Sequence, residues 1–149
     1  MSKSPEIVYV DTNVYLDWIL WRRGRGFMGH QGEEAKILFD DIKAGKYILL
    51  TSDHLEYQIK NNVPDMTQYT EYIHELDSRR LHMHIMKDRN DEDKARMESQ
   101  TNRTEFEDAL HFVLAIKGNA TLLVTQNEPD FRPFMKRIRV RCPKYTYIQ

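Results

Sequence analysis

The sequence has 149 residues, of which 40% are hydrophobic and 30% charged, and its formal charge at pH 7 is -1. This length and balance are typical of one globular domain with a core of useful size, so we expect a single domain over residues 1–149. The single cysteine, Cys142, excludes an intramolecular disulfide. No apolar stretch approaches the roughly 20 residues that cross a bilayer or has the form of a signal peptide, so we expect a cytoplasmic protein without membrane association.

The charges are unevenly distributed along the chain. Residues 88–108 contain eight acids and four bases, whereas residues 131–149 contain six bases and no acid. A second basic cluster, WRRGRG, occupies residues 21–26. Such separation favours an anionic partner, with an ordinary solvated surface as the alternative.

The first half of the chain alternates between strand and helix patterns. IVYV (7–10) is typical of a buried strand, and residues 14–23 carry apolar side chains at helical spacing, with Thr12 or Asn13 as the helix cap. Four glycines at 24–32 interrupt the pattern. The other elements predicted in this half are a helix over 33–43, a strand over 46–51, a helix that Ser52 caps and that ends near 61, and a helix over 66–79.

The second half begins with the strand-like LHMHIM (81–86). Residues 87–103 are highly charged and predict a mobile loop or a solvated helix. A capping box is predicted next, in which Thr104 accepts from the amide of Glu107 while the Glu107 side chain reaches back. The helix that follows has an apolar stripe and ends at Gly118.

The remaining strands complete the pattern. ATLLVT (120–125) is one, and either IRVRCP (138–143) or KYTYIQ (144–149) supplies the last. Strands that alternate with helices imply crossover connections, a parallel sheet and helices on both faces. The predicted fold class is α/β, a three-layer α/β/α domain with a central, mainly parallel sheet.

Four carboxylates lie where this topology forms a common edge. In an open parallel sheet, ligands bind at the carboxyl ends of the strands, near the point where the strand order reverses. Asp11 directly follows the first strand, and Glu56 lies early in the helix after the second. Asp108 lies in the first turn of the helix before the 120–125 strand, and Asp130 lies just beyond that strand.

Crowded carboxylates repel one another unless a cation offsets their charge. Mg²⁺ and Mn²⁺ prefer oxygen ligands, and a cluster of three or four acids suits one or two such ions. The alternative is that these acids only cap helices or interact with helix dipoles. Spacing along the chain leaves both interpretations open.

Three stretches carry a resemblance: VYVDTNVYLD (8–17), TSDHLEYQI (51–59) and FEDALHFVLAIKGNATLLVTQNEPDF (106–131). Together they resemble the PIN-domain ribonucleases, especially the VapC-type toxins of prokaryotic toxin–antitoxin pairs, from about residue 7 to 131. The resemblance implies a PIN-like fold and metal-dependent endonucleolytic cleavage of single-stranded or structured RNA. It implies Mg²⁺ or Mn²⁺ as cofactor, and RNA, a small antitoxin protein and a second copy of the chain in a homodimer as partners.

The resemblance also assigns site residues by position. The catalytic and metal-binding acids it implies are Asp11, Glu56, Asp108 and Asp130. Asp53, three residues before Glu56 on one helical face, is the alternative second acid. The residues that fall where the family uses polar groups to orient carboxylates or water are Thr12, Asn13 and Thr125. Asn127 stands where many relatives carry an acid, which puts a second metal ion in doubt.

The roles of several basic and aromatic residues are predicted with less support from sequence motifs, and each has an alternative. Arg22, Arg23, Arg25 and the arginines around 132–141 are predicted to contact RNA phosphates. His111 is predicted to lie at the edge of the core, with donation to a site carboxylate as the alternative. The aromatic residues of the first helix are predicted to pack in the core or against a partner, with stacking on bases as the alternative: Tyr15, Trp18 and Trp21.

Two other functional classes compete with a nuclease. One is a catalytically silent PIN-like module that binds RNA or protein, which the amide at Asn127 suggests. The other is a phosphoacceptor signalling domain, which needs an acceptor Asp after a middle strand. The strand over 46–51 does not end in an aspartate, so we rank this class below the nuclease.

Overall fold

The structure is a computed structural model that describes residues 5–21 and 30–147. Its centre is a five-stranded sheet with the order β3-β2-β1-β4-β5, and every neighbouring pair runs parallel. The strands are β1 (Glu6–Val10), β2 (Tyr47–Ser52), β3 (His82–Ile85), β4 (Leu122–Val124) and β5 (Arg139–Arg141). The predicted parallel sheet is therefore confirmed.

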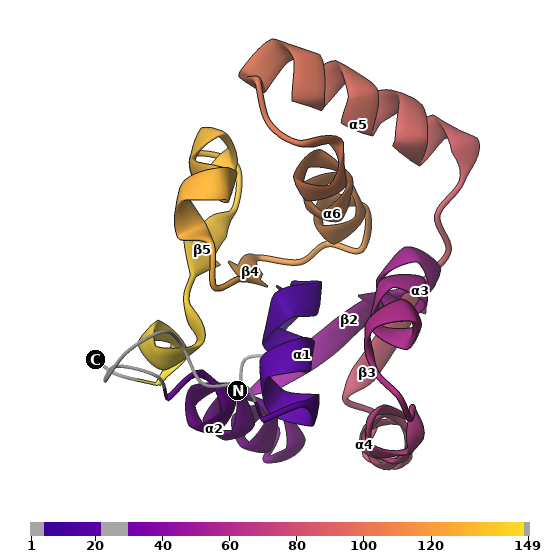
Figure 1. The fold of residues 1–149 in the computed structure, drawn as a ribbon, viewed down its shortest axis with the longest axis vertical. Coiled ribbons are helices and arrows are strands. Elements are labelled where there is room, and N and C mark those ends of the chain that lie inside the picture. Colours follow the sequence, from indigo (N-terminus) through magenta and orange to yellow (C-terminus); the bar gives the residue numbers. More distant parts are fainter. Residues whose placement is uncertain (1–4, 22–29, 148–149) are drawn as a thin grey trace.

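Helices connect these strands and cover both faces of the sheet. They are α1 (Thr12–Ile19), α2 (Gln31–Lys43), α3 (Asp53–Asn62), α4 (Thr67–Ser78), α5 (Arg89–Asn102), α6 (Phe106–Lys117) and the 3₁₀ helices η2 (Glu128–Phe134) and η3 (Pro143–Thr146). The chain adds β2 and β3 on one side of β1, then returns to add β4 and β5 on the other. Since crossover connections are right-handed, this reversal places α5 and α6 on the opposite face from α1 to α4. Figure 1 shows α5 alongside α6 and away from α1 and α2. The three-layer α/β fold is confirmed.

The central strands are buried on both faces, which explains their uninterrupted apolar sequences. Val8, Tyr9 and Val10 of β1 are fully buried, and β4 is buried along its whole length. β1 pairs with β4 in the register Val10–Val124, so the residues that follow both strands emerge together at the carboxyl edge of the sheet.

The ends of two helices differ from the prediction in an informative way. The cap of α1 is Asp11 instead of Thr12 or Asn13, because the Asp11 carboxylate accepts from the first amide of the helix. The predicted helix over 14–23 ends at Ile19. At Ser52 the prediction holds, since its hydroxyl accepts from the amide of Leu55 and caps α3.

The predicted capping box at Thr104 and Glu107 is wrong. The N-cap of α6 is Glu105, and no side chain bonds the helix start there. The Glu107 side chain instead crosses to α3, where it accepts from His54 and Gln58. A long-range contact thus replaces the local one that the sequence pattern predicted.

Of the two candidates for the last strand, IRVRCP contains β5. The alternative, KYTYIQ, overlaps η3, which begins at Pro143. Proline at the first position of a helix is favourable because its fixed φ suits the turn and its missing N–H has no helical partner in any case.

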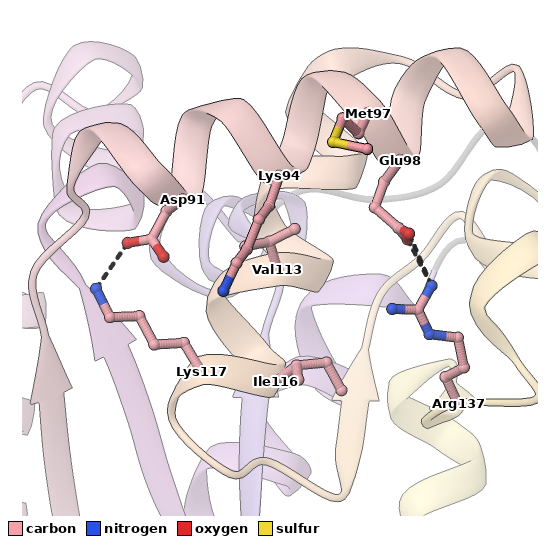
Figure 2. Close-up of a pocket in the computed structure, with 8 residues that line it drawn as sticks. All are labelled: Asp91, Lys94, Met97, Glu98, Val113, Ile116, Lys117 and Arg137. Carbon is pink, nitrogen blue, oxygen red and sulfur yellow. Dashed lines mark hydrogen bonds and ion pairs between the residues drawn. The ribbon is translucent and has the colours of Figure 1, made fainter.

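The charged segment 87–103 forms a regular helix, α5, which is the second of its two predicted forms. A capping box does start this helix, formed by Asp88 and Asp91. Figure 2 shows how ion pairs anchor α5: Asp91 to Lys117 at 2.7 Å, and Glu98 to Arg137 at 2.6 Å. Between the pairs lies a groove of about 410 Å³ with apolar side chains.

Helix α6 approaches the sheet closely at its end, where Gly118 caps it. A Cβ added at Gly118 would lie 2.2 Å from Leu50 Cδ2 and 3.0 Å from Leu50 Cγ, and Leu50 is fully buried. We therefore expect Gly118→Ala to destabilise the protein by about 1–3 kcal/mol through overpacking. Urea unfolding measures this, and adding Leu50→Val should make the two effects less than additive. Additive effects would show that Leu50 does not oppose the new methyl group.

Candidate functional site

Asp11 lies at the carboxyl end of β1, where the strand order reverses. Its backbone N–H donates to Val124 O at 2.8 Å, which extends the β1–β4 pairing by one residue. Its carboxylate accepts from Thr12 N at 2.7 Å and from Thr125 Oγ1 at 2.9 Å. The Asp11 side chain is only 11% exposed. A nearly buried carboxylate is thus held in a fixed orientation at the position where α/β sheets bind ligands.

Asp108 lies in the first turn of α6 and is half-buried. Burial, and after it the negative charges of Asp11, Asp130, Glu105 and Glu107, together raise the pKa of its carboxyl to about 7. Among the described residues, no hydrogen bond or ion pair reaches the Asp108 side chain. This carboxylate is destabilised by its acidic neighbours, and a bound cation would offset that repulsion.

Asp130 and Asn127 follow β4 on an exposed turn. Asp130 lies in η2, and its charge acts on Asp108. The Asn127 backbone N–H donates to Thr125 Oγ1 at 3.1 Å, and Asn13 Oδ1 accepts from the amide of Gln126 at 3.4 Å. Asp11 and Asp130 are therefore both within electrostatic reach of Asp108.

Glu56 has partners of its own on α4 and β3. Its carboxylate accepts from Tyr69 Oη of α4 at 2.7 Å, and the other oxygen is 3.9 Å from His84 Nε2 of β3. Asp53 also has structural partners, because its Oδ1 accepts from the amides of His54 and Lys87. The role of either residue in metal binding stays a prediction.

Gln58 of α3 contacts two residues that lie next to Asp11, namely Thr12 and His111. Its Oε1 accepts from Thr12 Oγ1 at 2.5 Å and faces His111 Nε2 at 2.7 Å, while its Nε2 donates to Glu107 Oε2 at 2.8 Å. His111 is buried, and its Nε2 is 3.6 Å from Asp11 Oδ1. Sequence reasoning missed Gln58, and it assigned Glu107 to a local cap. The helical spacing of residues 104–107 carries no signal of a contact with α3.

A polar cleft of about 440 Å³ opens beside the acids. Its lining residues are Ser99, Arg103, Thr104, Glu105, Phe106, Asp108, Pro129, Asp130 and Pro133. Arg103 is exposed at the C-cap of α5, with a left-handed backbone (φ 55°). No ion pair holds its guanidinium among the residues described, which makes it suited to an anionic group that enters the cleft.

Several arginines predicted to contact phosphates have other contacts. Arg137 pairs with Glu98, and Arg139 pairs with Glu6. Arg22, Arg23 and Arg25 lie outside the described residues.

The aromatic side chains of α1 mostly pack in the core. Tyr15 is fully buried and contacts Phe39. The ring centroids of Trp18 and Phe39 are 4.4 Å apart. This confirms core packing over base stacking for Tyr15 and Trp18. Trp21 is 46% exposed.

A divalent ion needs oxygen ligands that converge on one point. Over the described ranges, 5–21 and 30–147, no group of three or more His, Cys, Asp or Glu side chains converges as a metal-ligand set. Mg²⁺, however, keeps several waters and typically uses only one or two protein carboxylates. The charge of Asp11 acts on Asp108, and metal binding by these two acids stays a prediction.

Comparison with known proteins places this geometry in a family. The profile of the PIN domain family matches residues 7–128. The chain belongs to the PIN domain family. PIN domains are in general metal-dependent nucleases. A solved structure titled as a toxin-antitoxin complex from Klebsiella pneumoniae is similar with a TM-score of 0.55 and 20% identity, over 91% of this chain and 97% of that one. A search of curated proteins gives no match.

Helices in the described part of this PIN domain are all too short or too polar to cross a membrane.

The raised pKa of Asp108 predicts a pH-dependent gain in stability when its charge is removed. The pKa of Asp108 is higher in the folded than in the unfolded protein, so folding is favoured at low pH. This contribution to stability is complete below the unfolded pKa of about 3.9 and is lost as the pH rises through the folded pKa of about 7. Asp108→Asn should therefore raise the Tm of the metal-free protein at pH 8 by a few degrees, at about 2–4 °C per kcal/mol, and change it little at pH 4. Differential scanning calorimetry with the exposed Asp93→Asn as control measures this. An unchanged or lower Tm at pH 8 would contradict the proposed crowding.

Proposed function

We propose that this PIN domain is a divalent-metal-dependent endoribonuclease, acting as the toxin of a toxin–antitoxin pair. The observation that carries the proposal is the pair Asp11 and Asp108 at the carboxyl edge of a PIN fold, where the charge of Asp11 opposes ionisation of Asp108. Mg²⁺ or Mn²⁺ bound there would lower the pKa of a bound water and offset charge on the phosphate.

Each acid of the proposed site has its own role. Asp11 is oriented by Thr12 and Thr125, so its carboxylate loses little freedom when it binds a cation. Asp108 faces the cleft, which brings a phosphate in the cleft close to the acids. Asp130 lines the same cleft and adds negative charge that acts on Asp108. Glu56 remains part of the proposed set of acids, although its carboxylate bonds to Tyr69.

RNA is the proposed substrate because the cleft combines Asp108 and Asp130 with the exposed Arg103. Arg103 would bind a backbone phosphate and hold the strand against the acidic edge. A small antitoxin protein and a homodimer are proposed as partners. The similarity to a structure titled as a toxin-antitoxin complex supports the antitoxin.

Removal of the Asp11 charge tests the proposal. Asp11→Asn should lower Mn²⁺-dependent cleavage of single-stranded RNA by about 100-fold or more, because the best-fixed carboxylate of the edge is lost. The assay uses purified protein, with and without EDTA, and circular dichroism to verify the fold. The control is Asp93→Asn, an exposed acid of α5 that pairs with Arg96. Wild-type activity in Asp11→Asn would exclude this site, and folded wild-type protein without any RNase activity would favour the silent RNA- or protein-binding module.

Removal of the Arg103 charge tests the RNA path. Arg103→Gln should weaken binding of single-stranded RNA and reduce the slope of log K against log salt by about 0.7, the value of one phosphate contact. Fluorescence anisotropy in EDTA measures binding without cleavage. The matched control, Arg79→Gln on α4, removes an arginine that pairs with Glu75 and lies outside the cleft. Equal slopes for wild type and Arg103→Gln would place the RNA elsewhere.

A further inference from the structure

The groove between α5 and α6 presents large apolar side chains to solvent. Met97 of α5 is 69% exposed and Ile116 of α6 is 41% exposed, and both line the groove together with the buried Val113. Figure 2 shows these side chains between the two ion pairs that hold α5 in place. Apolar side chains that gather in a hollow at the surface are typical of a binding site.

A lysine without a partner extends over these apolar side chains. Figure 2 shows the Lys94 side chain reaching from α5 toward α6, between the two ion pairs. Over residues 5–21 and 30–147, no hydrogen bond or ion pair holds its ammonium group, whereas Lys117 and Arg137 each have an acid. The Lys94 ammonium is therefore available to a carboxylate from another molecule.

Arg137, at one end of the groove, is fixed in position but has donors to spare. Both of its hydrogen bonds to Glu98 use Nη1, at 2.9 and 2.6 Å. Arg137 Cζ lies 4.6 Å from the centroid of the Phe112 ring, which restricts the plane of the guanidinium. Its other side-chain N–H groups donate to nothing else in the part of the chain that the structure describes. A guanidinium held in this way loses little freedom when it binds a second carboxylate.

The accessible charge at this end of the groove is positive. The Arg137 side chain is 53% exposed, but the Glu98 side chain that neutralises it is only 21% exposed. Lys94 adds a second exposed cation. The opposite end is balanced, because the exposed Asp88 lies 3.5 Å from Lys117. An occupant with carboxylates beside apolar side chains complements this distribution of charge.

The floor of the groove favours a protein segment over RNA, which is also an anion. Single-stranded RNA binds by stacking its bases on aromatic side chains along a basic path. Over the described part of the chain, the lining residues include no aromatic side chain. The flexible thioether of Met97 and the aliphatic Ile116 are instead suited to the apolar face of an amphipathic helix.

We propose that the α5–α6 groove binds an acidic amphipathic helix of a partner protein. The apolar face of that helix covers Met97, Ile116 and Val113, and its carboxylates bind Lys94 and the open N–H groups of Arg137. The inference does not depend on the proposed nuclease activity, because the groove and the proposed acids are lined by different residues.

The first experiment uses a synthetic helical peptide of about 18 residues, or about five turns, with leucines on one face and glutamates beside them. Isothermal titration calorimetry in EDTA measures its binding to the full chain. The Kd should rise about tenfold or more in Ile116→Ser and in Lys94→Glu. The matched controls are Ile37→Ser, whose side chain is 39% exposed on α2, and Lys60→Glu, an exposed lysine of α3. Both controls should bind as the wild type does.

A peptide that does not bind the wild-type protein would overturn the proposal. Equal losses of affinity in the groove variants and the control variants would do the same. Circular dichroism verifies the fold of each variant.

The second experiment exchanges the charges of the two partners. A peptide with lysine in place of every glutamate should bind Lys94→Glu more tightly than it binds the wild type, because the charge pair is restored in the opposite sense. Lys60→Glu makes the same change in net charge outside the groove and should gain much less affinity. Equal gains in Lys94→Glu and Lys60→Glu would show attraction to net charge alone and would overturn the assignment of Lys94.

Two other occupants of the groove are outcomes of the same tests. Single-stranded RNA may replace the peptide in the titration with EDTA. Loss of RNA affinity in both Ile116→Ser and Lys94→Glu, with no binding of the acidic peptide, would overturn the proposal in favour of RNA. Analytical ultracentrifugation of the protein alone tests the second alternative. Self-association of the wild type that Ile116→Ser abolishes would place a second copy of the chain in the groove and would also overturn the proposal.

Discussion

The structure depends on the parallel pairing of β1 with β4, which places the carboxyl ends of these two buried strands at the same edge of the sheet. Asp11 continues that pairing through its backbone while its side chain turns toward the edge. The same residue caps α1 with its carboxylate, so one residue extends the sheet through its backbone, starts the first helix and supplies a carboxylate to the candidate site. A carboxylate used in this way cannot turn away when other acids approach. Its charge therefore acts on Asp108 permanently, and that fixed repulsion is what a cation would relieve.

The sequence was sufficient for the architecture because each part of it has a local cause. Apolar runs of β-branched and aromatic residues predict strands buried on both faces, and Ser52 predicts the start of α3 through its own hydroxyl. Alternation of strands and helices then predicts the parallel sheet. The failures lie at helix ends, where competing local bonds are nearly equal. Asp11 displaced Thr12 and Asn13 as a cap, and α1 ended earlier than its apolar spacing suggested.

The site was only partly predictable for a related reason. Asp11, Asp108 and Asp130 follow from the topology, since position along a strand or helix fixes the edge at which each emerges. The face of α3 that meets that edge depends on the rotation of the helix about its axis. Glu56 and Gln58 are only two positions apart, and this rotation decides which of them lies at the edge. A two-residue difference is about 200° around a helix, so one of them contacts Asp11's surroundings while the other faces α4. Glu107 was hidden because its partners, His54 and Gln58, are about fifty residues away in the chain.

The central claim is that Asp11 and Asp108 together bind one divalent ion at the carboxyl edge of the sheet. Its most direct test is the anomalous difference density of a crystal soaked in Mn²⁺, collected at the manganese absorption edge. The account predicts a peak within coordination distance, about 2.2 Å, of carboxylate oxygens from both residues. A fully occupied peak elsewhere, for example between Glu56 and His84, with none beside Asp11, would contradict it.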